Sequence, residues 1–247
     1  MGRPVRWGDC TAEEVGAAAR EERVAVLPVG ATEQHGPHLA TGTDTTLAEA
    51  MAAGACERTG DLLLPVVAYG CSLGHTDKWP GTLSLSPATL TTLIEDIGDW
   101  LFRNGFGRLV IVNGHATNGP PCESAMLQLR FRHPELMAKF VTVHHLTPEV
   151  SSLFTIDAED LHANATETAA MLHVRPELVH IDRAVDEEDR TIGRVFPYAM
   201  PDVTHSGVVG SPSLATPELG EDVFDKVVVA IAELLVKARA ERPPLQG

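Results

Sequence analysis

The stretch VAVLPVGATEQHGPHLATGTDTTL, residues 24–47, decides the fold and carries the first candidate site. Its apolar beginning, residues 24–29, predicts a buried strand that ends at Gly30. A loop then leaves the end of this strand, which is where ligands usually bind in an open α/β sheet. Four possible metal ligands lie on this loop or directly after it: Glu33, His35, His38 and Asp44. The stretch therefore predicts a strand that leads into a metal site.

The same residues also permit a purely structural interpretation. Asp44 stands just before the helical pattern Thr45–Cys56 and could cap that helix, while the histidines could be surface loop residues and Glu33 a solvated acid. In extended backbone, however, Glu33 and His35 point to the same side because they are two residues apart. An aspartate can cap a helix and still bind a metal, so this stretch alone leaves both interpretations open.

Composition narrows the classes of function. The 247 residues carry a formal net charge of −15, which argues against nucleic acid and anionic membranes as partners. Hydrophobic residues make up 44% and aromatic residues only 5%, so we expect a large, mostly aliphatic core. The four cysteines form no CxxC pair, and neither a signal peptide nor a membrane span is evident. We therefore expect a cytoplasmic protein with reduced thiols.

Apolar runs alternate with helical patterns along the chain. The runs predict strands at Arg23–Val29, Leu62–Ala68, Arg108–Val112 and Lys139–His144. The helical patterns lie at Thr11–Glu22, Thr45–Arg58, Ser86–Asn104, Pro121–Phe131, Thr168–His173 and Pro217–Arg239. This alternation predicts a three-layer α/β/α fold with a largely parallel central sheet. We expect residues 1–247 to form one domain, with residues 182–200 as an exposed excursion or a subunit contact.

Two later loops also carry possible metal ligands at the end of a strand or near the start of a helix. His115 follows the strand Arg108–Val112, and His162 lies five residues before Glu167, near the start of a predicted helix. In a parallel sheet the carboxyl ends of the strands share one edge, so ligands far apart in sequence can meet there. Carboxylates and imidazoles suit Zn, Mn or Fe. Two such ions a few ångströms apart can activate a water and polarise a carbonyl group.

The order of these motifs resembles the creatininase (creatinine amidohydrolase) family. The segments that carry the resemblance are LPVGATEQHGPHL at 27–39 with Thr43–Thr45, WPGT at 79–82, VNGH at 112–115, His162 with Thr166–Thr168, and GVVG at 207–210. They follow the family's order and span nearly the whole chain. The EQHGPHL block with its downstream aspartate is specific, whereas the other segments would be weak alone.

The resemblance implies a three-layer fold, a homohexamer and a two-metal hydrolase site. We expect one or two divalent metal ions per chain. The resemblance implies Glu33 on one metal, His35 on the other, Asp44 bridging them and His115 as a further ligand. His162 matches the family's catalytic histidine, which would protonate the leaving nitrogen.

The chain departs from creatininase itself directly after His115. Creatininase has a tyrosine and a metal-binding glutamate there, and this chain has Ala116 and Thr117. Glu167 is our candidate for the missing ligand and, with His162, for the catalytic pair, although it could also be only a helix first-turn acid. The tryptophans that hold creatinine have no evident match at 147–160, so creatinine is not the expected substrate.

His75, Thr117 and Asn118 are candidate substrate contacts. We expect His38 to support the site without binding metal. Four other histidines are expected to be ordinary surface or packed residues: His144, His145, His173 and His180.

The predicted function is metal-dependent hydrolysis of a C–N amide bond in a small or cyclic amide. One alternative is a peptidase that trims a short precursor peptide, like the mycofactocin-type relatives of this family. Another is a catalytically inactive scaffold of the same fold. A nucleophilic serine hydrolase is not supported, because no G-x-S-x-G motif occurs.

Overall fold

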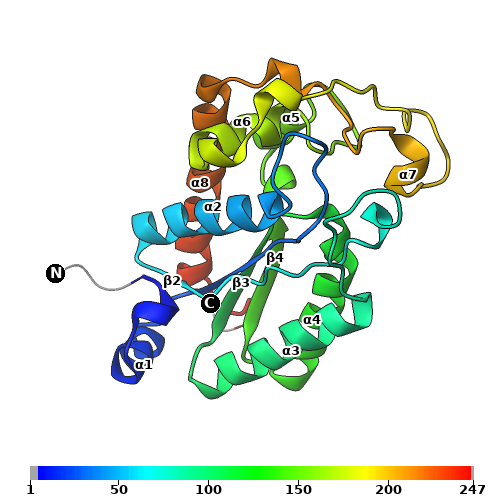
Figure 1. Cartoon of the computed structure of the whole chain (residues 1–247). Helices are drawn as coiled ribbons and strands as arrows, with labels where there is room; N and C mark the ends of the chain where they lie inside the picture. Colours follow the sequence, from blue (N-terminus) through cyan, green and yellow to red (C-terminus); the bar gives the residue numbers. More distant parts are fainter. Residues whose placement is uncertain (1–4, 246–247) are drawn as a thin grey trace.

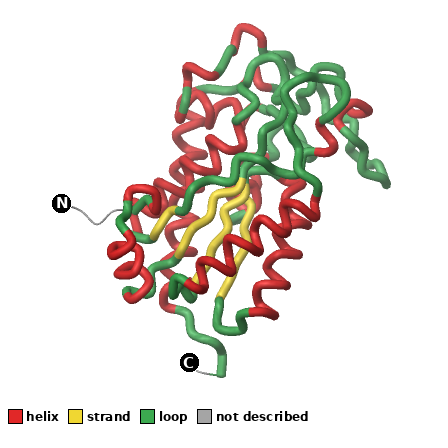
Figure 2. The backbone as a smooth tube through the Cα atoms, turned by 60° about the horizontal axis from the view of Figure 1, so that its bottom comes forward, coloured by secondary structure: helices red, strands yellow, loops and turns green. Residues whose placement is uncertain are grey.

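The computed structural model describes residues 5–245 and places a parallel sheet between two layers of helices (Figures 1 and 2). The sheet has four strands in the order β2-β1-β3-β4, all parallel. The strands are β1 (Ala25–Val29), β2 (Leu62–Leu63), β3 (Arg108–Asn113) and β4 (Met137–Thr142). The predicted three-layer α/β/α fold is confirmed.

Alternate residues of each strand face opposite helix layers, as the geometry of a strand requires. Val26 and Val110 pack with the layer of α2, α5, α6 and α8, whereas Leu27 and Ile111 pack with the layer of α1, α3 and α4. The helices are α1 (Ala12–Arg20), α2 (Thr43–Thr59), α3 (Pro87–Arg103), α4 (Gly119–Arg132), α5 (Pro148–Phe154), α6 (Ala165–Val174), α7 (Met200–Val203) and α8 (Pro217–Ala240). Both sheet faces are therefore covered, which explains why the strands read as continuous apolar runs.

Three helices, α2, α4 and α6, begin earlier than predicted, and the differences at α2 and α6 concern the site. Helix α2 begins at Thr43, with Gly42 at its N-cap position and no side-chain cap. Asp44 therefore lies inside the first turn, and the interpretation of Asp44 as the capping residue is wrong. Helix α6 begins at Ala165 because the Asn164 side chain accepts a hydrogen bond from the Glu167 backbone at 3.0 Å.

Two strands also differ from their predicted bounds. Strand β2 is only two residues long, since Pro65 has no N–H to donate to a ladder, and pairing with β1 resumes at a single bridge between Val29 and Val67. Strand β4 begins and ends two residues before the prediction. His144 consequently leaves the sheet and lies in the short 3-10 helix η4 (Val143–His145) at the carboxyl edge.

Residues 182–200 form the exposed excursion that the sequence predicts, visible in yellow and gold beside α7 in Figure 1. Within it, Val195 is 87% exposed and Phe196 is 70% exposed. Whether a second subunit covers these side chains stays a prediction. Among the helices of residues 5–245, none has the length and apolarity that a membrane span requires.

Close backbone contact between α6 and α8 holds the helix that carries Glu167. A Cβ atom built on Gly220 would lie 2.0 Å from the carbonyl oxygen of Ala169. We therefore expect Gly220→Ala to lower the free energy of unfolding by about 1–3 kcal/mol, as overpacked sites do. Urea unfolding followed by circular dichroism measures this change. Gly119→Ala is the matched control, because its Cβ would meet nothing within 4 Å, and equal stability of the two variants would contradict the prediction.

Candidate metal centre

The carboxyl edge of the sheet brings the predicted ligands together in one buried cluster. The loop after β1 supplies Glu33 and His35, the first turn of α2 supplies Asp44, and His115 is the second residue after β3. Glu167 comes from the first turn of α6, and His162 from an isolated bridge with Val209 just before that helix. These groups, except His35, line a cavity of about 180 Å³ together with Thr117 and His75. The prediction that distant loops converge here is confirmed.

The side chains form three sets whose ligand atoms all lie within 4.8 Å of one another. One set is His35, Asp44 and Glu167; a second is Glu33, His75 and His115; a third is Glu33, His35 and His162. Carboxylate and imidazole contacts are close throughout, with His35 Nε2 3.1 Å from Asp44 Oδ1 and His115 Nε2 3.2 Å from Glu33 Oε2. Such mixed nitrogen and oxygen donors suit divalent transition metals.

Several possible metal-ligand atoms of this cluster are buried and form no hydrogen bond with any residue in 5–245. They are both carboxylate oxygens of Glu33, Oδ2 of Asp44 and Nε2 of His35. Buried acceptors without partners are rare in proteins and costly. Bound cations would satisfy these atoms, so the residues present fit a metal site.

The pKa shifts within the cluster show how strongly its charges depend on one another. Burial raises the pKa of Glu33 and of Glu167 to about 7, in spite of the neighbouring imidazoles. Burial works against ionisation of Asp44 too, but His35 and His115 outweigh it and hold the Asp44 pKa well below its usual value. Burial likewise opposes a charge on His35, yet Asp44 raises its pKa to about 10. The carboxylates thus require positive charge beside them, from imidazolium or from metal.

His162 occupies a distinct position in the cluster. Its Nε2 lies 2.8 Å from the backbone oxygen of Gln34 and 3.1 Å from the Gln34 side-chain nitrogen. Its Nδ1 lies 3.7 Å from Glu33 Oε1 and therefore faces the donor cluster. Burial, followed by the repulsion of His35, holds the pKa of His162 well below its usual value, so the ring is neutral. Nδ1 is consequently the nitrogen that is available for proton transfer.

Gln34 and His144 are site residues that the sequence analysis did not select. The Gln34 amide is fixed in orientation, because its oxygen accepts from Gly36 at 2.9 Å and its nitrogen donates to Gly207 at 3.3 Å. His144 is packed, as predicted, yet it lines the cavity with Nε2 3.7 Å from Glu167 Oε1. In the sequence, Gln34 lies between the predicted ligands Glu33 and His35, and this position was the one signal that could have marked it as a site residue.

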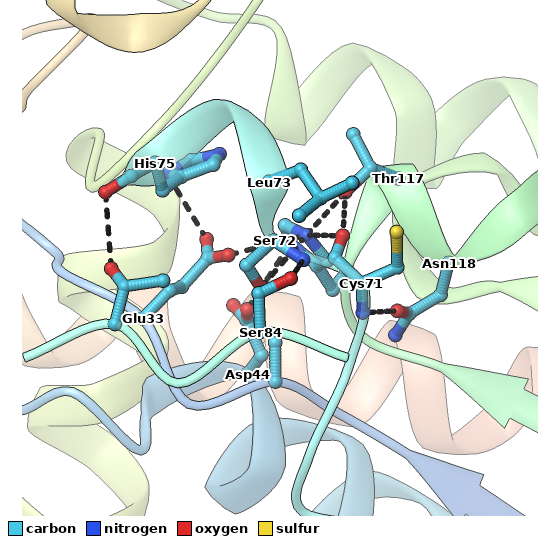
Figure 3. Close-up of polar contacts among 12 residues, drawn as sticks. Glu33, Asp44, Cys71, Ser72, Leu73, His75, Ser84, Thr117 and Asn118 are labelled. Atoms are coloured by element: carbon cyan, nitrogen blue, oxygen red, sulfur yellow. Dashed lines mark hydrogen bonds and ion pairs between the residues drawn. The ribbon is translucent and has the colours of Figure 1, made fainter. Parts of the chain in front are cut away.

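The three predicted substrate contacts lie differently around the cavity (Figure 3). Thr117 lines it, and its hydroxyl is 2.6 Å from His115 Nε2 and in close contact with the Cys71 carbonyl. Asn118 is fully buried and lies outside the cavity lining. Its amide oxygen accepts from the Cys71 backbone at 2.7 Å and its nitrogen donates to Gly30 at 3.0 Å, which ties the strand-end loops together.

His38 lies behind the cluster, where its Nε2 is 2.9 Å from the Thr168 hydroxyl. It belongs to none of the three sets, in keeping with the supporting role that the sequence analysis gives it.

Comparisons with known proteins place the chain in a family. The family model "Creatininase: Creatinine amidohydrolase" matches residues 8–235. The creatinine amidohydrolase of Pseudomonas putida is 32% identical over an alignment of 266 positions, gaps included. The alignment covers 99% of this chain and 100% of the relative. A mycofactocin precursor peptide peptidase of Mycolicibacterium smegmatis is 31% identical, with 88% of this chain and 86% of the relative covered.

The fold agrees as well. A crystal structure of creatinine amidohydrolase superposes with a TM-score of 0.85 at 31% identity, covering 98% of this chain and 100% of that one. The family match, the full-length relatives and the shared fold lead to one conclusion: this chain belongs to the creatininase family.

Proposed function

We propose that the chain is a hydrolase that uses divalent metal to cleave a C–N amide bond in a small or cyclic amide. The observation that carries this proposal is the Glu33 carboxylate, which is fully buried at the cavity with both oxygens lacking a hydrogen bond from residues 5–245. Three imidazoles approach this carboxylate within 3.7 Å. Family membership adds that relatives act on amide or peptide bonds, as their names state.

The residues proposed to hold the metal are those that the sequence selected: Glu33, His35, Asp44, His115 and Glu167. Zn, Mn and Fe all accept this mixture of donors, and we propose one or two ions per chain. When bound, such ions lower the pKa of a water molecule and polarise a carbonyl group. Glu167 is well placed for this role, since Ala163 donates a hydrogen bond to its Oε2 at 2.7 Å and thereby fixes the carboxylate.

His162 is proposed to move the proton that the reaction requires. Its ring is neutral, so Nδ1 can accept a proton on the cavity side and then donate it to the departing nitrogen. Gln34 contacts the opposite edge of the ring and prevents it from turning away. The chain thus supplies a positioned acid–base group beside a cluster suited to metal.

The size of the cavity favours a small substrate. Its volume of about 180 Å³ is below the roughly 300–1,000 Å³ of pockets for drug-sized ligands. Thr117 lines the wall where the resemblance places a glutamate in creatininase, which supports a substrate other than creatinine. The peptidase alternative keeps its support from the Mycolicibacterium smegmatis relative.

We further propose that the chain is a single domain, that it is cytoplasmic and that it forms a homohexamer. Light scattering after size-exclusion chromatography tests the homohexamer.

A substrate panel tests the proposed function. The protein is loaded in turn with Zn, Mn and Fe and supplied with creatinine, formamides, lactams and peptides of two or more residues, while the carboxylic acid product is measured by mass spectrometry. We expect turnover of a small amide or lactam by the metal-loaded protein, and none by Glu33→Gln. Cleavage of peptides alone would support the trimming peptidase instead. No turnover in a protein that holds its metal would favour the scaffold.

A further inference from the structure

His75 is buried although it lies in the long loop between β2 and α3. It ends the short 3-10 helix η2 (Leu73–His75), and only 8% of it is exposed. Two hydrogen bonds fix its backbone, because His75 donates to the Ser72 carbonyl at 3.0 Å and accepts from the Thr82 hydroxyl at 3.1 Å. The loop is thus built to hold this imidazole against the cluster.

The His75 ring points at Glu33, as Figure 3 shows. Its Nδ1 lies 3.5 Å from Glu33 Oε1, while His115 Nε2 lies 3.2 Å from Glu33 Oε2. The carboxylate therefore stands between two imidazoles, one beside each of its oxygens. Ligand atoms of a tetrahedral zinc ion with bonds near 2.0–2.1 Å are about 3.3 Å apart, so these separations match the first coordination sphere of a metal.

The three sets of possible ligands differ in the residues that they share. The set Glu33, His75 and His115 shares no residue with the set His35, Asp44 and Glu167, so both can be occupied together. The third set, which contains His162, shares Glu33 with the first set and His35 with the second. A metal ion bound to the third set would therefore exclude a metal ion from each of the other two. His75 is the third donor of the first set, beside Glu33 and His115.

We propose that His75 is a metal ligand, and that Glu33, His75 and His115 form a metal position separate from that of His35, Asp44 and Glu167. This inference rests on the proposed metal-dependent function. It replaces the substrate contact predicted for His75, because Nδ1 faces the Glu33 carboxylate and the Gln34 amide nitrogen at 3.5 Å. It also explains how two ions can be held where Thr117 offers only a hydroxyl.

Metal content per chain tests the assignment without reference to activity. Wild type, His75→Ala, Glu167→Ala and the double variant are saturated with Zn²⁺, dialysed and analysed by elemental analysis. We expect two ions in wild type, one in each single variant and at most one in the double variant, which keeps only the set Glu33, His35 and His162 intact. His145→Ala is the matched control, since His145 lines the same cavity but belongs to none of the sets, and it should keep both ions.

Spectroscopy of the Co²⁺-loaded proteins adds a second readout. The His75→Ala variant should lose the absorption of one Co²⁺ ion. The Co²⁺ ion held by His35, Asp44 and Glu167 should absorb as it does in wild type. Circular dichroism confirms that each variant is folded. If His75→Ala binds as many ions as wild type with equal affinity, His75 is no ligand and the inference is wrong. A wild-type protein that binds no ion overturns the proposed function itself, which is a different outcome.

Discussion

Replacing His162 with alanine is expected to lower kcat by about 10²- to 10⁴-fold, the usual range for a general acid–base group. The physical reason is that His162 presents a neutral ring with Nδ1 toward the donors and Nε2 held by Gln34. Metal content should stay at the wild-type level, since neither of the two disjoint sets contains His162. Steady-state kinetics on the best amide of the panel, together with elemental analysis, measures both quantities.

A chemical control distinguishes loss of the proton carrier from damage to the site. Added imidazole should restore part of the turnover of His162→Ala, because it can enter the space that the ring leaves. The His145→Ala variant, which changes a histidine at the rim of the same cavity, should keep its kcat. Full activity of His162→Ala, or loss of its metal, would contradict the proton-transfer role.

The fold was largely predictable because its strands are buried on both faces. A continuous apolar run such as Val24–Val29 has few alternatives to a central parallel strand, and the helical stripes between the runs place helices over it. Boundaries were less predictable where a local side chain decides them. Asn164 begins α6 three residues early, and Pro65 shortens β2, although neither effect changes the periodicity of apolar residues.

The candidate site could be predicted in its members but not in its contacts. Glu33 and His35 lie on the loop after β1 and His115 lies just after β3, so the sheet itself carries them to one edge. His144 was missed because β4 ends two residues earlier than its apolar pattern suggests. The direction of the His75 ring depends on hydrogen bonds to Ser72 and Thr82 within a long loop, and no periodic pattern reports such contacts.

Asp44→Asn is expected to abolish metal binding at both positions, the largest effect on metal content of any single change. Asp44 Oδ1 lies 3.1 Å from His35 Nε2, and Asp44 Oδ2 lies 3.3 Å from His115 Nδ1, so one carboxylate contacts an imidazole of each set. Asparagine keeps the size of the side chain but removes its charge. Without that charge, burial disfavours the protonated imidazoles and a bound cation alike.

Thermal and chemical unfolding with and without metal measures this loss independently of turnover. A ligand that binds only the folded state stabilises it by about 2.7 kcal/mol at 100 times its dissociation constant. Wild type should show a gain of this order on addition of Zn²⁺, and Asp44→Asn should show none. Glu159→Gln, which removes an exposed charge at the rim of the cavity, should keep the full gain. If Asp44→Asn retained one ion and half of the stabilisation, Asp44 would serve a single position, and the two sets would be independent of each other.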